Sequence, residues 1–205
     1  DARFTLMGYG LRNVQNTRIA LLQANGYEYE RSAYNMMMSL DSEIAPPVWP
    51  EDVELVTMAQ HAVLRDFAYG HQESFRDHRG FVDEPLEAVM RRWQDFSNSV
   101  PSFDPALWWL VRQRGQIAAV LMSVPDSDDD PGMAWVNVVG TLPAFRRQGL
   151  AEALLRHAFH EFQRRGIPRV GLGVDASSLT GATRLYERIG MHAYRIWDVY
   201  EKIVR

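Results

Sequence analysis

The sequence predicts a mixed α/β protein in which strands and helices alternate, and three observations support this prediction. Short apolar runs rich in strand-forming residues are separated by stretches with the periodicity of amphipathic helices. Two of the apolar runs are turned at Arg114 and Gly115, which is typical of a hairpin between antiparallel strands. The chain has no cysteine and so no disulfides, but its 205 residues are enough to bury a core without them.

The composition excludes several classes of protein. Without cysteine, a thiolate metal site and a cysteine nucleophile are ruled out. A formal net charge of -4 argues against a general nucleic-acid binder, whose surface is basic. No apolar run approaches the roughly 20 residues that span a bilayer, and the first residues lack the pattern of a signal peptide. We therefore expect a cytoplasmic protein with no nucleic-acid and no membrane partner.

The first 40 residues predict a strand, a helix and a strand. The segments RFTLMGYG and YERSAYNMMMSL are rich in strand formers, and NTRIALLQANGY predicts a helix that begins at Asn16 and is stopped by Gly26. Residues 41–50 follow with three prolines in ten positions, and they predict an extended linker.

Residues 51–205 predict a longer series of elements. VELVTM predicts a strand, a helical stretch follows over about 59–77, and Asp83 with Pro85 marks the start of a helix in DEPLEAVMRRWQDF. After the hairpin, MAWVNVVGTL predicts a strand and residues 150–165 an amphipathic helix closed by Gly166. A strand, a helix closed by glycine and a final strand are predicted by RVGLGV, GATRLYERIG and HAYRIWDVYEKIV.

The end of the chain repeats the order of its beginning. In both places a strand precedes a helix that ends in glycine, LLQANGY against LYERIGM, and an aromatic-rich strand follows. This order indicates that residues 1–40 are the terminal β-α-β piece of one domain and that residues 51–205 are a complete copy. The alternative is that the first 40 residues are an N-terminal extension that packs on the domain.

The stretch TLPAFRRQGLAEALL carries the main candidate site. Pro143 cannot donate to a ladder and ends the preceding strand, Arg146 to Gly149 form a turn, and a helix begins at about Leu150. The first amides of a helix lack internal partners and carry partial positive charge, so a turn that enters a helix binds anions. With its two arginines, the turn predicts a site for phosphate or pyrophosphate. The alternative is a surface turn with solvated arginines.

At this turn the sequence resembles a known family. Arg146, Gly149 and Ala151 match the Q/R-x-x-G-x-G/A signature of the GNAT superfamily of acyl-CoA-dependent N-acyltransferases. VGLGVDASSLTGATRLYERIGM is similar to the family's second hallmark, a strand followed by a helix that ends in L-Y-E-x-x-G-F/M. The resemblance covers about residues 53–205. SFRDHRGF and FDPALWWLV are similar to the tandem-domain branch that includes mycothiol synthase, in which residues 1–40 would end the upstream domain.

The resemblance implies a central, mostly antiparallel, twisted sheet that is splayed at the coenzyme A site and flanked by helices. It also implies direct transfer of acetyl from acetyl-CoA to a primary amine of a small molecule in a ternary complex. Backbone amides from Arg147 to Ala151 would hold the pyrophosphate, and an amide near Val139 would polarise the acetyl carbonyl. The coenzyme-binding residues that the resemblance implies are Val139, Thr141, Arg146, Arg147, Gln148, Gly149, Leu150, Ala151 and Ser178.

Tyr186 is the catalytic residue that the resemblance implies. In the family a tyrosine at this place protonates the departing thiolate of coenzyme A, whose pKa of about 8 to 10 is close to that of a phenol. The alternative is a core tyrosine, because Leu185 and Ile189 lie on much the same face. The matching residue in the upstream fragment is Leu22, so no catalysis is expected there.

The sequence does not identify the general base that takes the proton of the amine. Many relatives place a glutamate on the central strand, but MAWVNVVGT contains no carboxylate and Asn137 could only orient. The family often has an asparagine before the helix of Tyr186, where this chain has Ser177 and Ser178. A water chain remains a candidate base, as do Glu73, Asp77 and His78.

Two rival functions stay open. The domain could be a non-catalytic acyl-CoA-binding or structural module, which the missing base favours and Tyr186 argues against. A nucleotide-binding function is less well supported, because G-x-x-x-x-G-K-S/T and G-x-G-x-x-G are both absent.

The run DSDDD at residues 126–130 lacks the glycine and glutamate of a calcium loop, so no metal is predicted. The segment at residues 1–40 leaves a homodimer and a fragment as alternatives.

Overall fold

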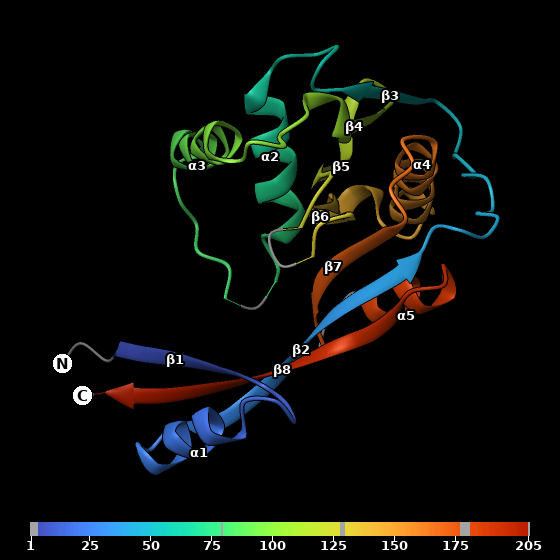
Figure 1. Ribbon diagram of the computed structural model, residues 1–205. Coiled ribbons are helices and arrows are strands. Elements are labelled where there is room, and N and C mark those ends of the chain that lie inside the picture. Colours follow the sequence, from blue (N-terminus) through green and yellow to red (C-terminus); the bar gives the residue numbers. More distant parts are fainter. Residues whose placement is uncertain (1–3, 79, 128–129, 177–180, 205) are drawn as a thin grey trace. The chain divides into compact units, whose positions relative to one another are not determined.

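The computed structural model describes residues 4–78, 80–127, 130–176 and 181–204 (Figure 1). In this part of the chain the strands and helices follow the order predicted from the sequence: β1 (Phe4–Leu11), α1 (Asn16–Ala24), β2 (Glu28–Ser39), β3 (Val53–Thr57), α2 (Leu64–Phe75), α3 (Leu86–Ser99), β4 (Trp108–Gln113), β5 (Gln116–Val124), β6 (Met133–Thr141), α4 (Leu150–Arg164), β7 (Arg169–Asp175), α5 (Ala182–Arg188) and β8 (His192–Val204). Short 3-10 helices at Pro105–Leu107 and Pro143–Phe145 precede β4 and α4.

The start of α2 differs from the predicted boundary. The helix begins at Leu64 and not near residue 59, because the preceding residues form a turn. The amides of Gln60 and His61 donate to the carbonyl oxygen of Thr57 at 3.1 and 2.8 Å. The Gln60 side chain accepts from the Thr57 amide at 3.0 Å. These hydrogen bonds satisfy the backbone of the turn without a helix.

The chain divides into two compact units, and each is described by itself. The smaller unit comprises Asp1–Met38 and Leu172–Arg205, and the larger unit comprises Ser39–Gly171. The division therefore falls within β7. Within the described residues, no helix is long and apolar enough to cross a membrane.

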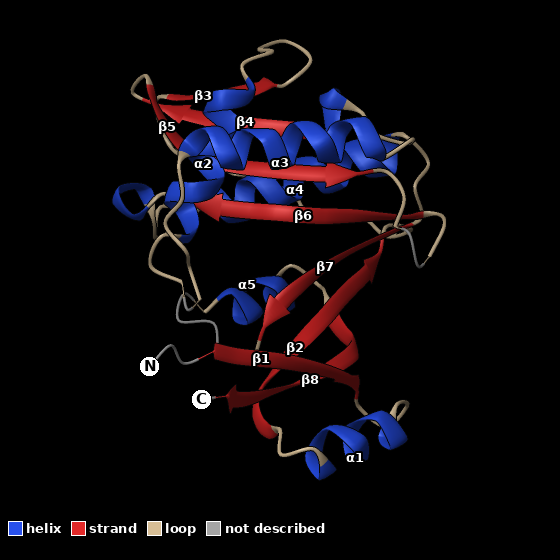
Figure 2. Cartoon of the chain, turned by 90° about the vertical axis from the view of Figure 1, so that its left-hand side faces the viewer, coloured by secondary structure: helices blue, strands red, loops and turns tan. Residues whose placement is uncertain are grey.

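The larger unit is a sheet with helices on both faces (Figure 2). Its strands lie in the order β6-β5-β4-β3 with antiparallel neighbours, and the first half of β7 follows β6. Helices α2 and α3 cover one face and α4 covers the other (Figure 2). Neighbouring residues of β4 serve the two faces, since Trp108 packs against Phe67 of α2 and Trp109 packs against Phe162 of α4. The predicted mixed α/β fold with a mostly antiparallel sheet is confirmed.

Two glycines let α2 lie close to the sheet. A Cβ atom placed on Gly140 of β6 would lie 2.5 Å from the Cβ of Ser74, which is closer than such atoms approach in proteins. A Cβ atom on Gly70 of α2 would lie 3.2 Å from the Cβ of Val120 on β5. Because α2 packs tightly on β5 and β6, the last turn of this helix lies next to the end of β6.

In the smaller unit, the C-terminal strand β8 lies between β1 and β2 (Figure 1). Both pairings are antiparallel, and Asp198 of β8 lies opposite Gly10 on one side and Ser32 on the other. Arg12 links the three strands, because its guanidinium donates to Asp198 Oδ2 at 3.0 Å and to Ser32 Oγ at 2.8 Å. Helix α1 packs on β1, where Gly8 makes room for Leu22. The division of the chain into domains stays a prediction.

Candidate functional site

The predicted anion-binding turn joins β6 to α4 in the larger unit. Its two ends are anchored in the core, because Leu142 and Leu150 are 8% and 1% exposed. Between them Arg147 and Gly149 adopt left-handed backbone angles, with φ of 63° and 84°. Glycine adopts this conformation without the steric cost that a side chain brings. In the described residues no side chain caps the start of α4, so its first amides are available to an anion.

The two arginines of the turn have different surroundings. The Arg146 guanidinium donates to Asp77 Oδ1 and Oδ2 at 2.8 and 2.5 Å. It also donates to the carbonyl oxygens of Ser74 and Thr141 at 3.0 and 3.1 Å. The hydrogen bond to Asp77 is the main reason why the pKa of Arg146 is raised. Arg147, in contrast, is exposed and pairs with no residue in the described ranges. The sequence offered no means of telling the two arginines apart.

The carboxylates suggested as bases are both held by arginines. The hydrogen bond from Arg146 lowers the pKa of Asp77 to about 2, so this carboxylate is a weak proton acceptor at neutral pH. Glu73 accepts from Arg76 at 2.6 and 3.0 Å. The ring of His78 lies edge-on to Phe75, with centroids 4.7 Å apart. The structure therefore weighs against Asp77 and leaves the base open.

The strand before the turn contains a bulge that no sequence signal marks. The register between β5 and β6 shifts between Met122 and Ser123, so Asn137 of β6 is an extra residue that lies opposite no single partner. A bulge leaves backbone groups without ladder partners and is common beside active sites. Val139 and Thr141, both half-buried, follow on the same strand. Their roles as coenzyme contacts stay predictions.

Two buried hydroxyl groups lie on residues that contact Arg146. Ser74 Oγ and Thr141 Oγ1 are buried and form no hydrogen bond within the described residues. A buried hydroxyl without a partner costs about 1 to 3 kcal/mol, and such groups in native structures call for an explanation. Ser74 Oγ lies against the backbone of Gly140, in the tight contact between α2 and β6.

Tyr186 lies on α5 in the smaller unit. It is 6% exposed, and burial raises its pKa to about 12. The hydroxyl therefore keeps its proton at neutral pH, as a proton donor must. Ser178 and the neighbouring Ser177 lie outside the described residues. The catalytic role of Tyr186 and the coenzyme contact of Ser178 stay predictions.

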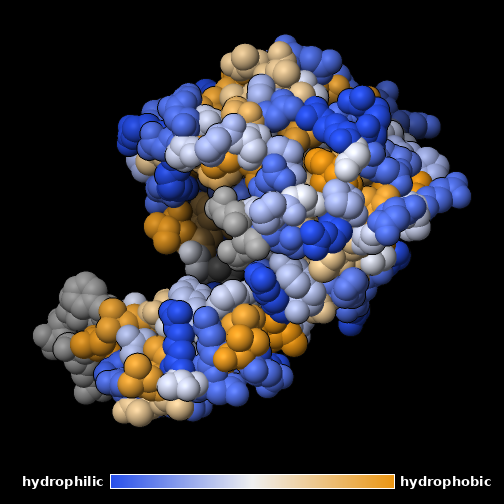
Figure 3. All heavy atoms as spheres, in the orientation of Figure 1, coloured by the Kyte–Doolittle hydropathy of each residue, from blue (hydrophilic) through white to orange (hydrophobic). Residues whose placement is uncertain are grey.

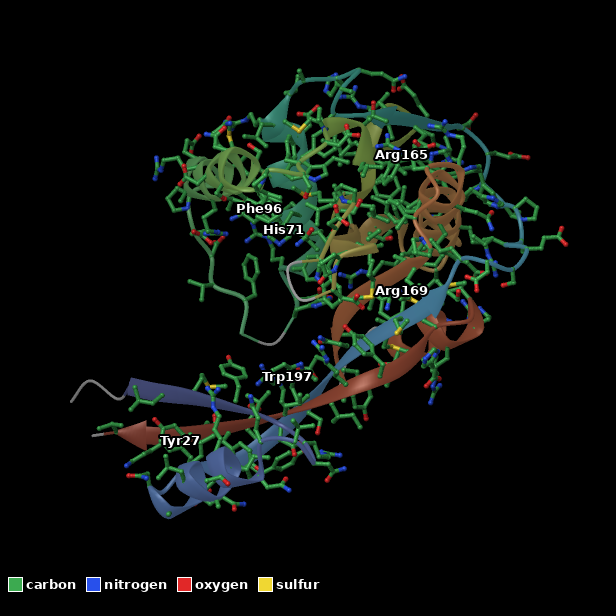
Figure 4. All side chains as sticks on the ribbon, in the orientation of Figure 1. Tyr27, His71, Phe96, Arg165, Arg169 and Trp197 are labelled. Carbon is green, nitrogen blue, oxygen red and sulfur yellow. The ribbon has the colours of Figure 1, made fainter. Side chains whose placement is uncertain are left out.

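Aromatic side chains fill the layer between α2 and α3, to which His71 and Phe96 belong (Figure 4). His71 Nδ1 accepts a hydrogen bond from Trp93 Nε1 at 3.1 Å. Burial lowers the pKa of His71 to about 4, so the ring is neutral at pH 7 with its proton on Nε2. Sequence reasoning did not single out this histidine. Its Trp93 contact and its burial mark it as part of the packed layer.

The aspartate-rich loop uses its described carboxylates within the protein. Asp126 accepts from the Gly132 amide at 3.0 Å, and Asp130 accepts from Arg169 at 2.9 Å through both oxygens. Among the described residues, no group of three or more His, Cys, Asp or Glu side chains is placed to hold a metal ion.

Comparison with known proteins identifies similar sequences. A family model described as the acetyltransferase (GNAT) family matches residues 67–191. Two curated relatives named mycothiol acetyltransferase, from Thermobispora bispora and Thermobifida fusca, are each 28% identical to the chain, over 181 and 197 residues. The matches cover 86% and 87% of this chain but only 59% and 58% of the relatives. The chain thus spans less than two thirds of the length of these relatives.

Solved structures agree with this fold. A GCN5-related N-acetyltransferase from Sphaerobacter thermophilus matches with a TM-score of 0.80 and 30% identity, over 100% of this chain and 61% of the other. A tandem GNAT protein from the clavulanic acid biosynthesis pathway matches with a TM-score of 0.69 over 97% of this chain and 64% of the other. At 13% identity the second likeness shows the fold alone.

Proposed function

Because the chain belongs to the acetyltransferase (GNAT) family, we propose that it transfers the acetyl group of acetyl-CoA to a primary amine of a small molecule. The amine nitrogen attacks the thioester carbon directly, a C–N bond forms and the C–S bond breaks. The amine loses one proton, and the coenzyme A thiolate gains one. The observation that carries the proposal is the uncapped start of α4 after a tight turn with Gly149 in the left-handed conformation.

The turn supplies the groups that this binding requires. Backbone amides from Arg147 to Ala151 bind the pyrophosphate, since anions are stabilised at a helix N-terminus. The exposed Arg147 adds positive charge. An amide near Val139 polarises the acetyl carbonyl, and the bulge at Asn137 supports this step because it frees backbone groups on the same strand. Tyr186 donates to the departing thiolate.

The acceptor is proposed from the relatives. Two of them are named mycothiol acetyltransferases, so small-molecule amines related to mycothiol are the first acceptors to test. The base is Glu73, His78 or a water chain, because the hydrogen bond from Arg146 lowers the pKa of Asp77 to about 2.

The domain organisation is proposed on separate grounds. Residues 1–40 are the terminal piece of an upstream GNAT-like domain, residues 41–50 a linker, and residues 51–205 the complete domain. Exposed apolar side chains on the smaller unit support this proposal (Figure 3). Leu6, Tyr9, Leu21 and Ile203 are between 45% and 64% exposed. Leu6 lies on the α1 side of β1, whereas Tyr9 and Ile203 lie on the opposite face, so apolar surface is exposed on both faces, as expected where a further domain packs. In a homodimer a second copy would cover it instead.

Isothermal titration of the purified chain with acetyl-CoA tests the proposal first. Saturable binding is expected, and reversing the charge at both Arg146 and Arg147 should weaken it strongly. Release of free thiol in the presence of candidate amines then measures turnover. A wild-type chain that does not bind acetyl-CoA would contradict the proposal.

Binding without turnover would favour a second function, a non-catalytic acyl-CoA-binding module. The observation in favour of this alternative is the lack of a carboxylate on β6.

A further inference from the structure

We propose that Arg146 is a positioning residue, which together with Asp77 locks the turn before α4 onto the last turn of α2 in the geometry that binds the coenzyme. This inference rests on the proposed function. It gives Arg146 a role different from that of Arg147, which is left to contact the ligand with its side chain.

The hydrogen bonds of Arg146 carry the inference. A guanidinium has five N–H groups, and four of those of Arg146 are used within the chain. Nε donates to the carbonyl of Thr141, and one terminal nitrogen donates to both the Ser74 carbonyl and Asp77 Oδ1. The other terminal nitrogen donates to Asp77 Oδ2. A side chain occupied in this way has little capacity left for a phosphate.

The acceptors lie on the elements that meet at the turn. Thr141 is the last residue of β6, Ser74 lies in the last turn of α2, and Asp77 follows that helix. The carbonyls of a last helical turn have no partner within the helix, and a cation there is favoured by the helix dipole. Arg146 therefore joins a strand end, a helix end and the turn in a single set of bonds.

The close packing of α2 on β6 makes these hydrogen bonds of Arg146 possible. Gly140 leaves room for Ser74 to lie against β6, and the bare backbone brings the end of α2 within reach of the arginine. Arg146 is also shielded, with a side chain 24% exposed. By contrast, Arg147 belongs to the exposed part of the turn.

The charge of Asp77 gives the proposal a test with opposite signs. A carboxylate beside a phosphate site repels the ligand. Its presence there therefore requires another role that outweighs the repulsion. If Arg146 binds phosphate with its side chain, Asp77 competes for it. Removing the Asp77 charge would then release the arginine and tighten binding. If the pair positions the turn, the same change weakens binding, because the turn loses its bidentate anchor.

The experiment is isothermal titration of the full chain with acetyl-CoA, comparing wild type with Asp77→Asn. The expected Kd is higher by about three- to tenfold, which corresponds to the loss of charge-assisted hydrogen bonds. Asp83→Asn is the matched control. It removes the same charge from the segment after α2, but Asp83 pairs with Arg76 at 3.2 Å and not with the turn. Its Kd should stay within about twofold of wild type.

A double variant separates positioning from general loss of structure. In Asp77→Asn with Arg146→Ala, binding should be no weaker than in Arg146→Ala alone, because the two side chains act as one unit. Circular dichroism and the urea midpoint confirm that each variant is folded at the titration temperature. Tighter or equal binding in Asp77→Asn would contradict the positioning role of Arg146 and Asp77 but leave the proposed function intact. Absence of binding in wild type overturns both.

Discussion

The Tyr186 hydroxyl keeps its proton throughout the usual assay range, because burial raises its pKa to about 12. Complete proton transfer from such a group to a thiolate of pKa about 9 is uphill by roughly 3 pKa units, or about 4 kcal/mol. In its present environment Tyr186 is therefore expected to stabilise the thiolate chiefly by donating a hydrogen bond. If coenzyme binding exposed the Tyr186 ring to water, the pKa of the hydroxyl would fall and proton transfer would become less uphill.

Replacing Tyr186 by Phe should lower kcat by about 10²-fold while leaving the Kd for acetyl-CoA nearly unchanged, because only the hydroxyl is lost. Steady-state kinetics and titration measure the two constants. Ionisation of Tyr186 should cause no loss of wild-type activity between about pH 7 and pH 10, since the raised pKa keeps the group protonated there. Tyr200→Phe, at another buried tyrosine, is the control. Unchanged turnover in Tyr186→Phe would remove this residue from the mechanism.

Replacing Arg147 by Ala should raise the Kd for acetyl-CoA by about three- to tenfold at low ionic strength, because the proposed phosphate contact is lost. The effect should shrink as salt is added, since the Debye length falls from about 10 Å at 0.1 M to about 3 Å at 1 M. Titration over a salt series measures it. Arg114→Ala is a matched control, because Arg114 is also an exposed arginine with a left-handed backbone, with φ of 52°. A salt-independent loss at Arg147 would indicate a change of turn shape and not a charge contact.

At the scale of elements, α2 and β6 approach closely because Gly140 has no side chain. Gly140→Ala should lower the free energy of unfolding by about 1 to 3 kcal/mol, since the new methyl group overlaps the Ser74 Cβ and α2 must shift. Urea denaturation measures the loss. Gly70→Ala is the comparison, because its methyl group would lie 3.2 Å from Val120 and alanine favours a helix by about 1 kcal/mol.

The smaller loss is therefore expected in Gly70→Ala. Equal stability of Gly140→Ala and wild type would mean that α2 moves away from β6 without cost. The position of the Asp77–Arg146 pair depends on this packing, so Gly140→Ala should also weaken acetyl-CoA binding.

Most elements could be predicted because their signals are local. Arg114 and Gly115 both have positive φ, 52° and 74°, as a two-residue hairpin turn requires. Helix α2 begins later than the local pattern predicts, because Thr57 and Gln60 form a hydrogen-bonded turn that competes with the helix. The bulge at Asn137 cannot be predicted locally, because it results from the register of β6 with β5 and has no local sequence signal.

At the scale of the whole chain, Arg12 and Asp198 join the N-terminal segment to the C-terminal strand. The hydrogen bond from Arg12 lowers the pKa of Asp198, with a further contribution from Ser32. A carboxyl group with a lowered folded pKa contributes stability above its unfolded pKa of about 3.9, and this contribution is lost as the pH falls through the folded value.

Asp198→Asn should therefore lower the free energy of unfolding by about 1 to 2 kcal/mol at pH 7. The difference between wild type and variant should shrink as the pH falls from about 5 towards 2. Urea denaturation over this pH range provides the measurement. Asp52→Asn is the control, because the Asp52 side chain is 66% exposed and lies 3.6 Å from Arg114. A difference that stays constant with pH would show that the ionised form of Asp198 contributes nothing.

The sequence by itself determined the order of strands and helices, the turn at Arg146 to Gly149 and the resemblance to the GNAT family, because each depends on residues that are neighbours in the chain. Only the tertiary structure decided that Arg146 is held by Asp77, which lies 69 positions away, and that β8 lies between β1 and β2. It also separated Arg146 from Arg147, whose roles looked alike. The physical reason is that an arginine's partners depend on which elements pack against its own, and here that packing depends on the close approach of α2 to Gly140.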